Sequence, residues 1–254
     1  MKILISLATY NERENLPILV EEIFWFAPDV DILVVDDNSP DGTGDWVAEQ
    51  MGHEPRLKLI RRSVKLGLGT ATLAAMQYAI EHDYAFLLNM DADLSHSPQY
   101  LAAIRSKADE GFDVVIGSRY VQGGGVEGWP FVRRWMSRSI NLYAKLLLGL
   151  KTQDNSGSFR CYRTEILKKL DPEKIISQGY SFLEEVLFRL HQAGATFAEV
   201  PIIFAERRHG TSKINAKEAL RALGVLLRLA VARVWGIGHL VVSLYYTSFW
   251  YWSI

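Results

Sequence analysis

Short apolar, β-branched segments alternate along the chain with longer segments whose apolar residues recur at helical spacing. Strands are expected at residues 2–8, 31–37, 56–62, 84–90 and 113–120. Helices are expected at residues 15–27, 69–82 and 97–111, the last with Ser97 as its N-cap and Pro98 as its first helical residue. The strand segments are nearly continuous apolar runs, which is typical of strands buried on both faces. This β-α-β order predicts an α/β fold, a mostly parallel sheet with helices on both faces.

Charged and polar residues follow directly on the strand segments. Tyr10 to Glu12, Asp36–Asp37, Asp91 to Asp93 and Arg119 all lie just past the end of a strand. In open parallel sheets, ligands bind beyond the carboxyl ends of the strands. We therefore expect these side chains to converge on one edge of the sheet.

The same edge binds dinucleotides in Rossmann folds, which are therefore a competing class. Its first strand should lead into G-x-G-x-x-G, whereas here it leads into "ATYNERENLP", which contains no glycine. The later glycines at 67–71 and 123–125 have neither the spacing nor the place of that motif, and no P-loop is present. The sequence therefore argues against both of these nucleotide-binding classes.

Asp91 and Asp93 stand one residue apart at the end of a buried strand, in "LLNMDADLSHSP". Like charges this close are unfavourable unless a cation lies between them. Two carboxylates are suitable ligands for Mg²⁺ or Mn²⁺, which completes its coordination with waters and substrate phosphates. The pattern indicates a metal–diphosphate site, and the alternative is an Asx turn that precedes the helix at Pro98.

Composition is that of a folded protein: 254 residues, 49% hydrophobic and 22% charged. The single cysteine, Cys161, excludes an internal disulfide and a cysteine-based zinc site, and it indicates a small buried residue in a reducing compartment. The first residues predict a strand and no signal peptide. The net charge of −1 conceals an acidic first half and basic segments at 119–163 and beyond 206. That segregation suits an anionic substrate held by a metal ion and by arginines, or it reflects ordinary solvated faces.

Several stretches together resemble one known family. They are "TYNERENLP", "VVDDNSPDGT", "MDADLSHSP", "GSRYVQGGGVEGW", "SGSFRCYR", "GYSFLEEV" and "EVPIIFAERRHGTSK", together with "SR" at 137–138. Over residues 3–215 the chain resembles the dolichyl-phosphate (polyprenol-monophosphate) mannosyltransferases, which are inverting enzymes of the GT-A nucleotide-sugar transferase fold. The resemblance implies GDP-mannose as donor, a polyprenyl or dolichyl phosphate as acceptor, and Mg²⁺ or Mn²⁺ as cofactor. No nucleic acid is expected among the partners.

The resemblance also implies roles for individual residues. Ala8, Tyr10, Glu12, Asp37 and Asp91 match donor nucleotide-binding positions, and Asp91 and Asp93 match metal ligands. Arg119, Arg133, Ser137, Arg207 and Lys213 match positions that bind acceptor and donor phosphates, and Asp91, Asp93 and Arg119 form the implied catalytic group. The chain departs from the pattern at Ala8, where a proline is usual, and at Ser95, where some relatives have a glutamine ligand.

The implied acceptor is already anionic at neutral pH, so it can attack the sugar without a strong general base. Arginines must then hold two anions close together, and their planar, permanently charged guanidinium groups suit this work. The alternatives are a UDP-glucose-dependent polyprenyl-phosphate glucosyltransferase, a transferase for a soluble sugar or protein, and a non-catalytic nucleotide-sugar-binding protein. Glu184 and Glu185 are expected in the first turn of a helix, and His96 and His209 in loops.

The C-terminal part predicts contact with lipid. The chain divides into a catalytic domain at 1–212 and a membrane-associating segment at 213–254. Lys213, Lys217, Arg221 and Arg228 recur at helical spacing opposite an apolar face, and residues 234–254 carry no formal charge. An interfacial or re-entrant tail is favoured over a full crossing, because Trp and Tyr cluster at its very end. The expected location is the cytoplasmic face of a membrane, as a peripheral or tail-anchored protein, and partner subunits in the membrane are compatible with the resemblance.

Overall fold

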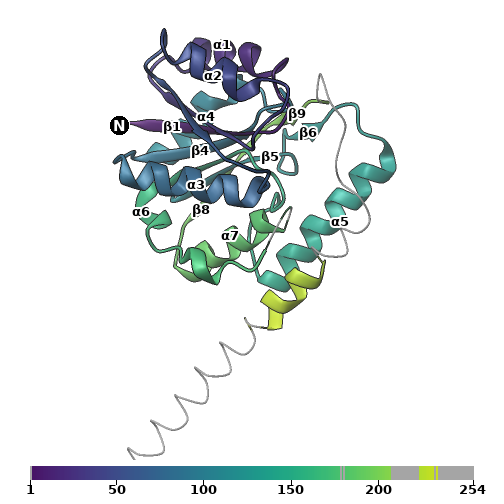
Figure 1. Ribbon diagram of the computed structural model, residues 1–254. Coiled ribbons are helices and arrows are strands. Elements are labelled where there is room, and N and C mark those ends of the chain that lie inside the picture. The colour runs from purple at the N-terminus through teal and green to yellow at the C-terminus, as the bar shows by residue number, and fades with distance from the viewer. Residues whose placement is uncertain (1, 178, 180, 207–222, 232, 234–254) are drawn as a thin grey trace, which may run out of the picture.

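A seven-stranded sheet runs through the centre of the molecule in the order β3-β2-β1-β4-β7-β5-β8 (Figure 1). The computed structural model describes residues 2–177, 179, 181–206, 223–231 and 233. The strands are β1 (Ile3–Thr9), β2 (Asp31–Asp36), β3 (Leu57–Arg61), β4 (Phe86–Asp91), β5 (Val114–Ser118), β7 (Arg160–Arg163) and β8 (Phe197–Pro201). All neighbouring strands pair in parallel except β7, which is antiparallel to both β4 and β5. The expected α/β architecture with a mostly parallel sheet is confirmed.

Helices cover both faces of this sheet. They are α1 (Leu16–Phe26), α2 (Thr43–Gln50), α3 (Leu68–Glu81), α4 (Leu101–Asp109), α5 (Phe131–Leu148), α6 (Thr164–Leu167) and α7 (Phe182–Gln192), with short 3₁₀ turns at Pro98–Tyr100 and Pro172–Lys174. The Ser97 hydroxyl accepts the N–H of Gln99, and Pro98 begins the helical turn, as the sequence predicts. The short helix α2 was missed, because its sequence TGDWVAEQ follows directly on a turn-rich run.

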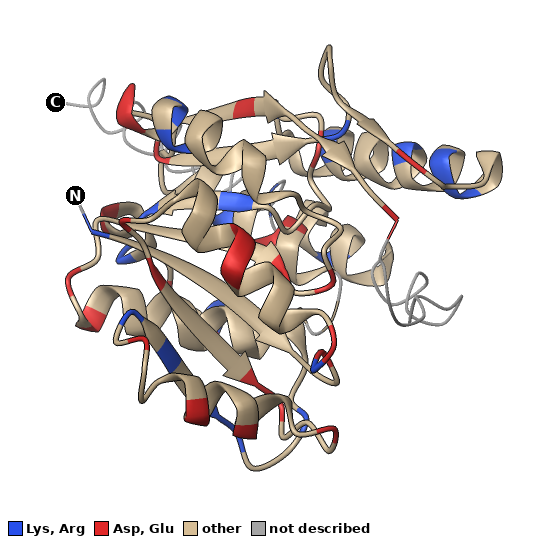
Figure 2. Cartoon of the chain, turned by 90° about the horizontal axis from the view of Figure 1, so that it is seen from above, with Lys and Arg blue, Asp and Glu red and all other residues tan. Residues whose placement is uncertain are grey.

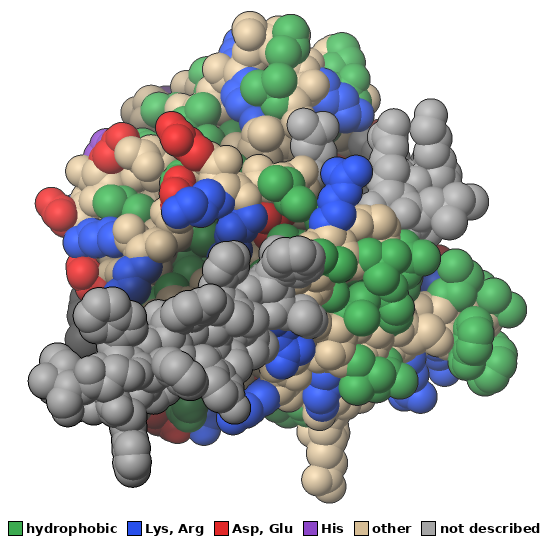
Figure 3. Space-filling view, turned by 90° about the horizontal axis from the view of Figure 1, so that it is seen from below, with side chains coloured by type: hydrophobic (Ala, Val, Ile, Leu, Met, Phe, Trp, Pro, Cys, Tyr) green, Lys and Arg blue, Asp and Glu red, His purple; other side chains and the backbone are tan. Residues whose placement is uncertain are grey.

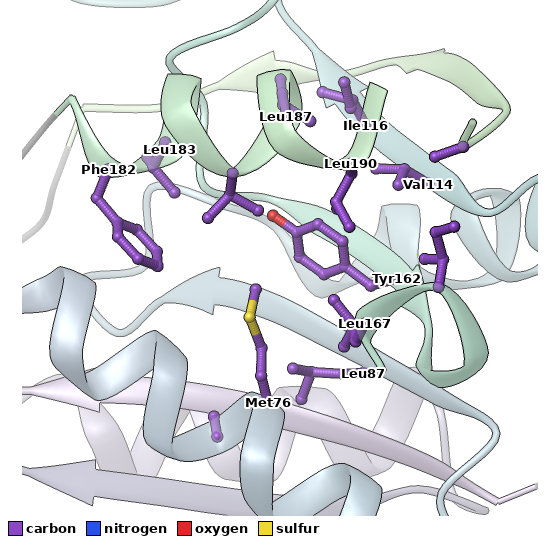
Figure 4. Close-up of a cluster of buried hydrophobic side chains, with 14 of the residues drawn as sticks. Met76, Leu87, Val114, Ile116, Tyr162, Leu167, Phe182, Leu183, Leu187 and Leu190 are labelled. Carbon is purple, nitrogen blue, oxygen red and sulfur yellow. The ribbon is translucent and has the colours of Figure 1, made fainter. Parts of the chain in front are cut away.

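Apolar side chains on the two faces of the sheet form two separate hydrophobic cores. Leu87 and Ile116 point toward α3 and α7, where they pack with Met76, Tyr162, Leu183 and Leu187 (Figure 4). Leu4 belongs to the same core. Their strand neighbours point the other way and pack on α1, α2 and α4: Ile3, Ile5, Phe86, Leu88 and Val115. Because successive side chains of a strand alternate between faces, a strand that is apolar on both sides must be covered on both. Cys161 is buried in the second core, where burial raises the pKa of its thiol to about 12.

A small second sheet shapes the edge at which β5 ends. Its strands β6 (Gly125–Val126) and β9 (Ile203–Phe204) pair in parallel, with Val126 opposite Phe204. This pairing joins the segment after β5 to the segment after β8. The loop that leads into α5 is thereby held against the sheet edge.

Helix α5 extends along one side of the molecule, with the helical residues 223–231 beside it (Figure 1). Leu226 and Leu229 are buried in the first core, and the Arg233 Nη1 donates to the carbonyl of Leu147 at 3.2 Å. The predicted helix that carries Arg228 is therefore confirmed for this part, whereas the 212/213 boundary and the tail at 234–254 lie outside the described residues. Among the helices described, none is long and apolar enough to cross a bilayer.

Candidate functional site

The carboxyl ends of the three parallel strands β1, β2 and β4 bring predicted polar residues to one edge. Ala8 of β1 pairs with Asp91 of β4, and Thr9 pairs with Asp36 of β2. Asp37 continues this order, since its N–H donates to the carbonyl of Thr9 at 3.0 Å. The expected convergence at the sheet edge is therefore found.

Asp91 is the carboxylate that reaches solvent. Its side chain is 34% exposed, and its Oδ1 accepts a hydrogen bond from the Ser158 hydroxyl at 2.6 Å. Asp93 is buried, and its Oδ1 accepts both the N–H of Ser95, at 3.1 Å, and the Ser95 hydroxyl, at 2.5 Å. Ser95 is itself fully buried and so orients Asp93 rather than extending toward the solvent.

The donor set at this position suits a hard divalent cation. Within the described part of the chain, no group of three or more His, Cys, Asp or Glu side chains is arranged to hold a metal ion. Mg²⁺ commonly takes only one or two carboxylates and completes its octahedron with waters and substrate phosphates. A half-exposed Asp91 next to Asp93 fits that requirement.

His96 lies in the loop after β4, as expected, but its side chain is buried. Its Nδ1 accepts the main-chain N–H of Asp91 at 3.0 Å, which places the ring proton on Nε2. The ring stacks on Phe159 and meets the edge of Phe204, with centroids at 4.9 and 5.1 Å. Burial lowers the pKa of His96 and outweighs the opposing charges of Asp91 and Asp93. His96 is therefore a neutral residue that orients the Asp91 main chain.

Arg119 is almost completely buried against Asp154. Its Nε and Nη2 donate to the two carboxylate oxygens at 2.7 Å each, and its main-chain N–H donates to Oδ2 at 3.0 Å. Burial alone would lower the pKa of Arg119, but the charge of Asp154 and its hydrogen bonds raise it; the same pairing lowers the pKa of Asp154 against the effect of burial. Asp154 had no signal in the sequence, since it stands in the loop "TQDNSGS" outside any motif.

Arg133 and Ser137 lie one helical turn apart on α5, on the side that faces Arg119. The Tyr120 hydroxyl donates to the Ser137 Oγ at 2.6 Å. The guanidinium of Arg133 lies 4.0 Å from the centre of the Trp129 ring, and that of Arg119 lies 5.7 Å from it. Trp129 thus brings together two of the arginines that were predicted to bind phosphate.

On the other side of Asp91, the loops after β1 and β2 are tied together. The N–H groups of residues 11, 12 and 13 donate to Ser39, Thr43 and Asp41, each at 3.0 Å. Glu12 accepts from the Asn15 amide at 2.8 Å. These contacts fix the loop that carries Tyr10 and Glu12 beside the loop that carries Asp37.

Asp37 is buried and organises the segment that follows β3. It accepts the N–H groups of Leu66 and Gly67, at 3.2 and 2.8 Å, and pairs with Arg62. Only 9% of the Arg62 side chain is exposed, so this ion pair is buried. The Nζ of Lys65 lies 3.6 Å from the centre of the Tyr10 ring. Lys65 was missed, although its position past a strand end was a signal that could have indicated it.

Buried charge is also found at the start of α7. Glu184 and Glu185 stand in its first turn, as expected, but both are buried. Glu185 accepts main-chain N–H groups of Ile176 and Ser177 and pairs with Arg189 at 2.5 Å. Glu184 Oε2 has no hydrogen-bond partner among the described residues, and burial raises the pKa of this carboxyl to about 7.

The site residues that were predicted from sequence thus fall into three groups. Ala8, Tyr10, Glu12, Asp37, Asp91, Asp93 and Arg119 lie at the ends of the strands, and Arg133 and Ser137 lie on α5. Arg207 and Lys213 lie outside the described residues, as does His209. What each residue binds stays a prediction.

Comparison with known proteins gives a consistent result. The family model described as glycosyl transferase family 2 matches residues 5–171. A "Polyprenol monophosphomannose synthase" of Mycolicibacterium smegmatis is 42% identical over 221 residues, which cover 87% of this chain and 83% of the relative. An "Undecaprenyl-phosphate mannosyltransferase" of Micrococcus luteus is 38% identical over 235 residues, which cover 92% of this chain and 96% of the relative.

Among solved structures, glucosyl-3-phosphoglycerate synthase from Mycobacterium tuberculosis is similar in fold. Its complex with Mn²⁺, UDP and phosphoglyceric acid superposes with a TM-score of 0.62 at 18% identity, covering 92% of this chain and 77% of that one. Its complex with Mg²⁺ and UDP gives a TM-score of 0.61 at 18% identity, with coverage of 92% and 78%. At this identity the likeness establishes the GT-A-like fold alone.

Proposed function

This chain belongs to glycosyl transferase family 2, and from that membership we propose that it transfers mannose from GDP-mannose to a polyprenyl (dolichyl-type) monophosphate, giving polyprenyl-phosphate mannose and GDP. The names of the two relatives, at 42% and 38% identity over most of this chain, support a polyprenyl phosphate acceptor and a mannosyl product. The choice of GDP-mannose as donor rests on the sequence resemblance around Tyr10, Glu12 and Asp37.

The observation that carries this proposal is the division of α5 into two faces. Its inner face presents Arg133 and Ser137 beside Arg119, where an acceptor phosphate would bind. Its outer face is apolar and exposed, with Val132, Trp135, Leu142 and Leu146 between 57% and 69% exposed. The same helix therefore has a basic face suited to a phosphate and an apolar face suited to the lipid chain attached to it.

The surroundings of α5 extend this surface. The helix carries Arg133, Arg134, Arg138 and Lys145 and no acidic residue (Figure 2). Leu223, Leu227 and Val231 form an exposed apolar row on the neighbouring helical segment 223–231. Hydrophobic side chains bordered by Lys and Arg gather on the face seen in Figure 3. An exposed apolar surface with basic flanks suits the headgroup region of an anionic bilayer, and we place the protein at the cytoplasmic face of a membrane.

The proposed chemistry is a single displacement with inversion. An anionic oxygen of the acceptor phosphate forms a bond to the anomeric carbon of mannose, while the bond from that carbon to the β-phosphate oxygen of the donor breaks and its electron pair leaves with GDP. Arg119 and Arg133 hold the acceptor dianion close to the donor diphosphate, against the repulsion between them. Asp91 and Asp93 would hold a Mg²⁺ or Mn²⁺ ion, which would neutralise charge on the departing diphosphate.

No side chain has to remove a proton from this acceptor, because its nucleophilic oxygen is already ionised. The arrangement agrees with this, since neither His96 nor Asp154 is available as a base: His96 accepts from Asp91, and both oxygens of Asp154 are engaged by Arg119. The residues supply positioning and charge compensation. A transferase for neutral hydroxyl acceptors would need a free base at the same place.

The test is transfer of label into an organic-solvent phase. The full chain, with Mn²⁺ or Mg²⁺ and lipid vesicles, is incubated with labelled GDP-mannose and polyprenyl phosphate, and the lipid product is extracted and identified by mass. The proposal requires product with polyprenyl phosphate and none with the corresponding polyprenol. Equal or greater transfer from UDP-glucose would replace mannose by glucose as the donor sugar, and absence of any lipid product would refute the proposed acceptor. In this assay Arg119→Ala should form little lipid product, whereas Arg105→Ala, on α4 in a pair with Asp29, is the control that should form as much as the wild type.

A further inference from the structure

Four rings form a continuous aromatic column next to the site: Phe159, His96, Phe204 and Trp129. Phe159 stacks on His96 with centroids 4.9 Å apart, and the edge of Phe204 meets His96 at 5.1 Å. Trp129 meets Phe204 at 5.4 Å in an edge-on arrangement. All but Phe204 are at least nine-tenths buried. Offset and edge-on ring contacts of this kind are favourable.

The two ends of the aromatic column contact different parts of the site. Near the Phe159 end, His96 Nδ1 accepts the main-chain N–H of Asp91 at 3.0 Å. At the other end, Trp129 carries the guanidinium of Arg133 at 4.0 Å from its ring centre and that of Arg119 at 5.7 Å. The column therefore spans from the carboxylate on the donor side to the cations on the acceptor side.

Two guanidinium groups at one ring repel each other when no anion lies between them. The negative face of an indole ring offsets part of this repulsion, and tryptophan is the most effective side chain for that purpose. Arg119 has further ring contacts, to Tyr120 at 5.2 Å and Phe204 at 5.6 Å. Of the two guanidinium groups, that of Arg133 lies nearer the indole, at 4.0 Å against 5.7 Å, so the attraction to the ring is stronger for Arg133.

The position of Trp129 is itself fixed by the fold. Val126 of β6 pairs with Phe204 of β9. Because Trp129 follows β6 by three residues, this pairing brings its ring to that of Phe204. The carbonyl of Trp129 accepts from Arg134 Nε at 2.9 Å, at the start of α5. Trp129 thus joins the second sheet to the helix that carries Arg133.

We propose that Trp129 is a positioning residue, which holds the guanidinium groups of Arg119 and Arg133 at the spacing that one phosphate monoester dianion requires. The column beneath it sets the distance between this pair of cations and Asp91. The inference rests on the proposed function and specifies how that acceptor site is built. Trp129 acts through the arginines and does not react.

The test compares Trp129→Phe and Trp129→Leu in the full chain, with steady-state kinetics for both substrates. Both variants are apolar and smaller than tryptophan, but leucine lacks an aromatic face. We expect KM for polyprenyl phosphate to rise about 5- to 30-fold in W129L and clearly less in W129F, with KM for the nucleotide sugar unchanged. Equal acceptor KM values in the two variants, or parallel rises in both substrates' KM values, would overturn the proposal and leave Trp129 a packing residue.

A second measurement does not depend on packing. Site-specific incorporation of mono-, di- and trifluorotryptophan at 129 weakens the attraction between ring and cation while the ring keeps its shape. The proposal requires acceptor KM to rise stepwise with fluorine number, and a constant acceptor KM across the series would contradict it. The wild-type chain distinguishes this inference from the function itself. If the wild type transfers no sugar to lipid phosphate, the proposed function fails. If it transfers sugar normally and the acceptor KM is constant across the fluorotryptophan variants, only the role of Trp129 is refuted.

Discussion

Asp154 holds Arg119 by three hydrogen bonds, one from the main-chain N–H and two from the guanidinium group. A further bond joins Nη2 to the Ser156 hydroxyl at 3.0 Å. Among the described residues, no hydrogen-bond partner is found for Nη1. The guanidinium is therefore fixed along its Nε–Nη2 edge, and Nη1 is the donor left for an anion.

This pairing predicts that Arg119→Lys loses activity out of proportion to the retained charge. A lysine ammonium cannot donate in parallel to both Asp154 oxygens and still direct a donor at the substrate. We expect turnover to fall on the order of 100-fold or more, as when one preorganised donor is removed from an active site. Near wild-type turnover in the assay for polyprenyl-phosphate mannose would refute the role, and Arg105→Lys on α4 is the matched exchange at an exposed pair.

Asp154→Asn changes the other partner of this ion pair and tests its contribution to stability. It keeps the shape of the side chain but leaves a buried guanidinium without its counter-charge, which costs about 3–5 kcal/mol of unfolding free energy. Urea denaturation at pH 7 measures this loss. Asp29→Asn, which breaks the exposed pair with Arg105, should change stability by less than about 1 kcal/mol. Equal effects of the two substitutions would contradict the assignment of Asp154 as a buried partner.

Asp91 and Asp93 are expected to respond differently to amidation. Asp91→Asn should remove most of the metal-dependent part of the thermal shift produced by GDP, while the melting temperature without ligands changes little, because its side chain is 34% exposed. Asp93→Asn should lower the ligand-free melting temperature as well, since Asp93 is buried and accepts two hydrogen bonds from Ser95. Differential scanning fluorimetry with and without GDP and Mn²⁺ provides both readings. A metal-dependent shift that survives Asp91→Asn would exclude this carboxylate as a ligand.

The outer face of α5 predicts lipid binding. Replacing Trp135 and Leu142 together by serine removes two large apolar side chains that are 63% and 57% exposed. Each contributes on the order of 1.5 kcal/mol or more when buried, so binding to anionic vesicles should weaken at least about tenfold. Trp25→Ser on α1 removes an even more exposed tryptophan, at 82%, and serves as the control. The expectation fails if both variants sediment with vesicles as the wild type does.

Glu184 predicts a specific pH dependence of stability. Burial raises the pKa of its carboxyl from 4.5 to about 7, so the folded state retains a proton that the unfolded state has lost between these values. Below pH 4.5 both states are protonated. As pH rises from 4.5 to 7, the contribution of Glu184 lowers the free energy of unfolding by up to about 3 kcal/mol, and above pH 7 this loss stays constant.

Glu184→Gln should remove that slope. We expect the unfolding free energy of the variant, relative to wild type, to be higher at pH 8 than at pH 5. Asp154 and Arg119 also lie near this carboxyl, and their pairing lowers the pKa of Asp154 and raises that of Arg119, so both stay charged over the range and do not contribute to the difference. Glu165→Gln, at an exposed pair with Lys168, is the control with no such change. Identical pH profiles for wild type and E184Q would show that Glu184 is ionised in the folded state.

The sheet and its functional edge could be predicted because they depend on local pattern. Apolar runs such as 84–90 predict a buried strand. Asp91 comes directly after this run, so a parallel strand places it at the carboxyl edge of the sheet. The insertion of β7 between β4 and β5 could not be predicted, since RCYR is short and carries no signal of antiparallel pairing. That insertion places Arg160 opposite Asn89 and the loop with Ser158 beside Asp91.

Pairings between distant loops were equally out of reach. Asp154 and Arg119 are 35 residues apart, and Asp37 meets Gly67 from 30 residues away. Such contacts depend on how loops cross the sheet edge and leave no periodic trace in the chain. The two-sided nature of α5 was in principle visible in FVRRWMSRSINLYAKLLL, whose apolar and basic positions separate at helical spacing.

That two-sidedness has a geometric consequence for substrate choice. A helix with its side chains is about 10 Å across, so a helix resting on a bilayer holds its upper face within one headgroup layer of the acyl chains. The site can then bind the reacting phosphate at the depth of the lipid headgroups, and the isoprenoid chain can stay in the bilayer during the reaction. Discrimination would fall on the first few carbons next to the phosphate, and acceptors that differ only in the length of their distal chain should be consumed at similar rates.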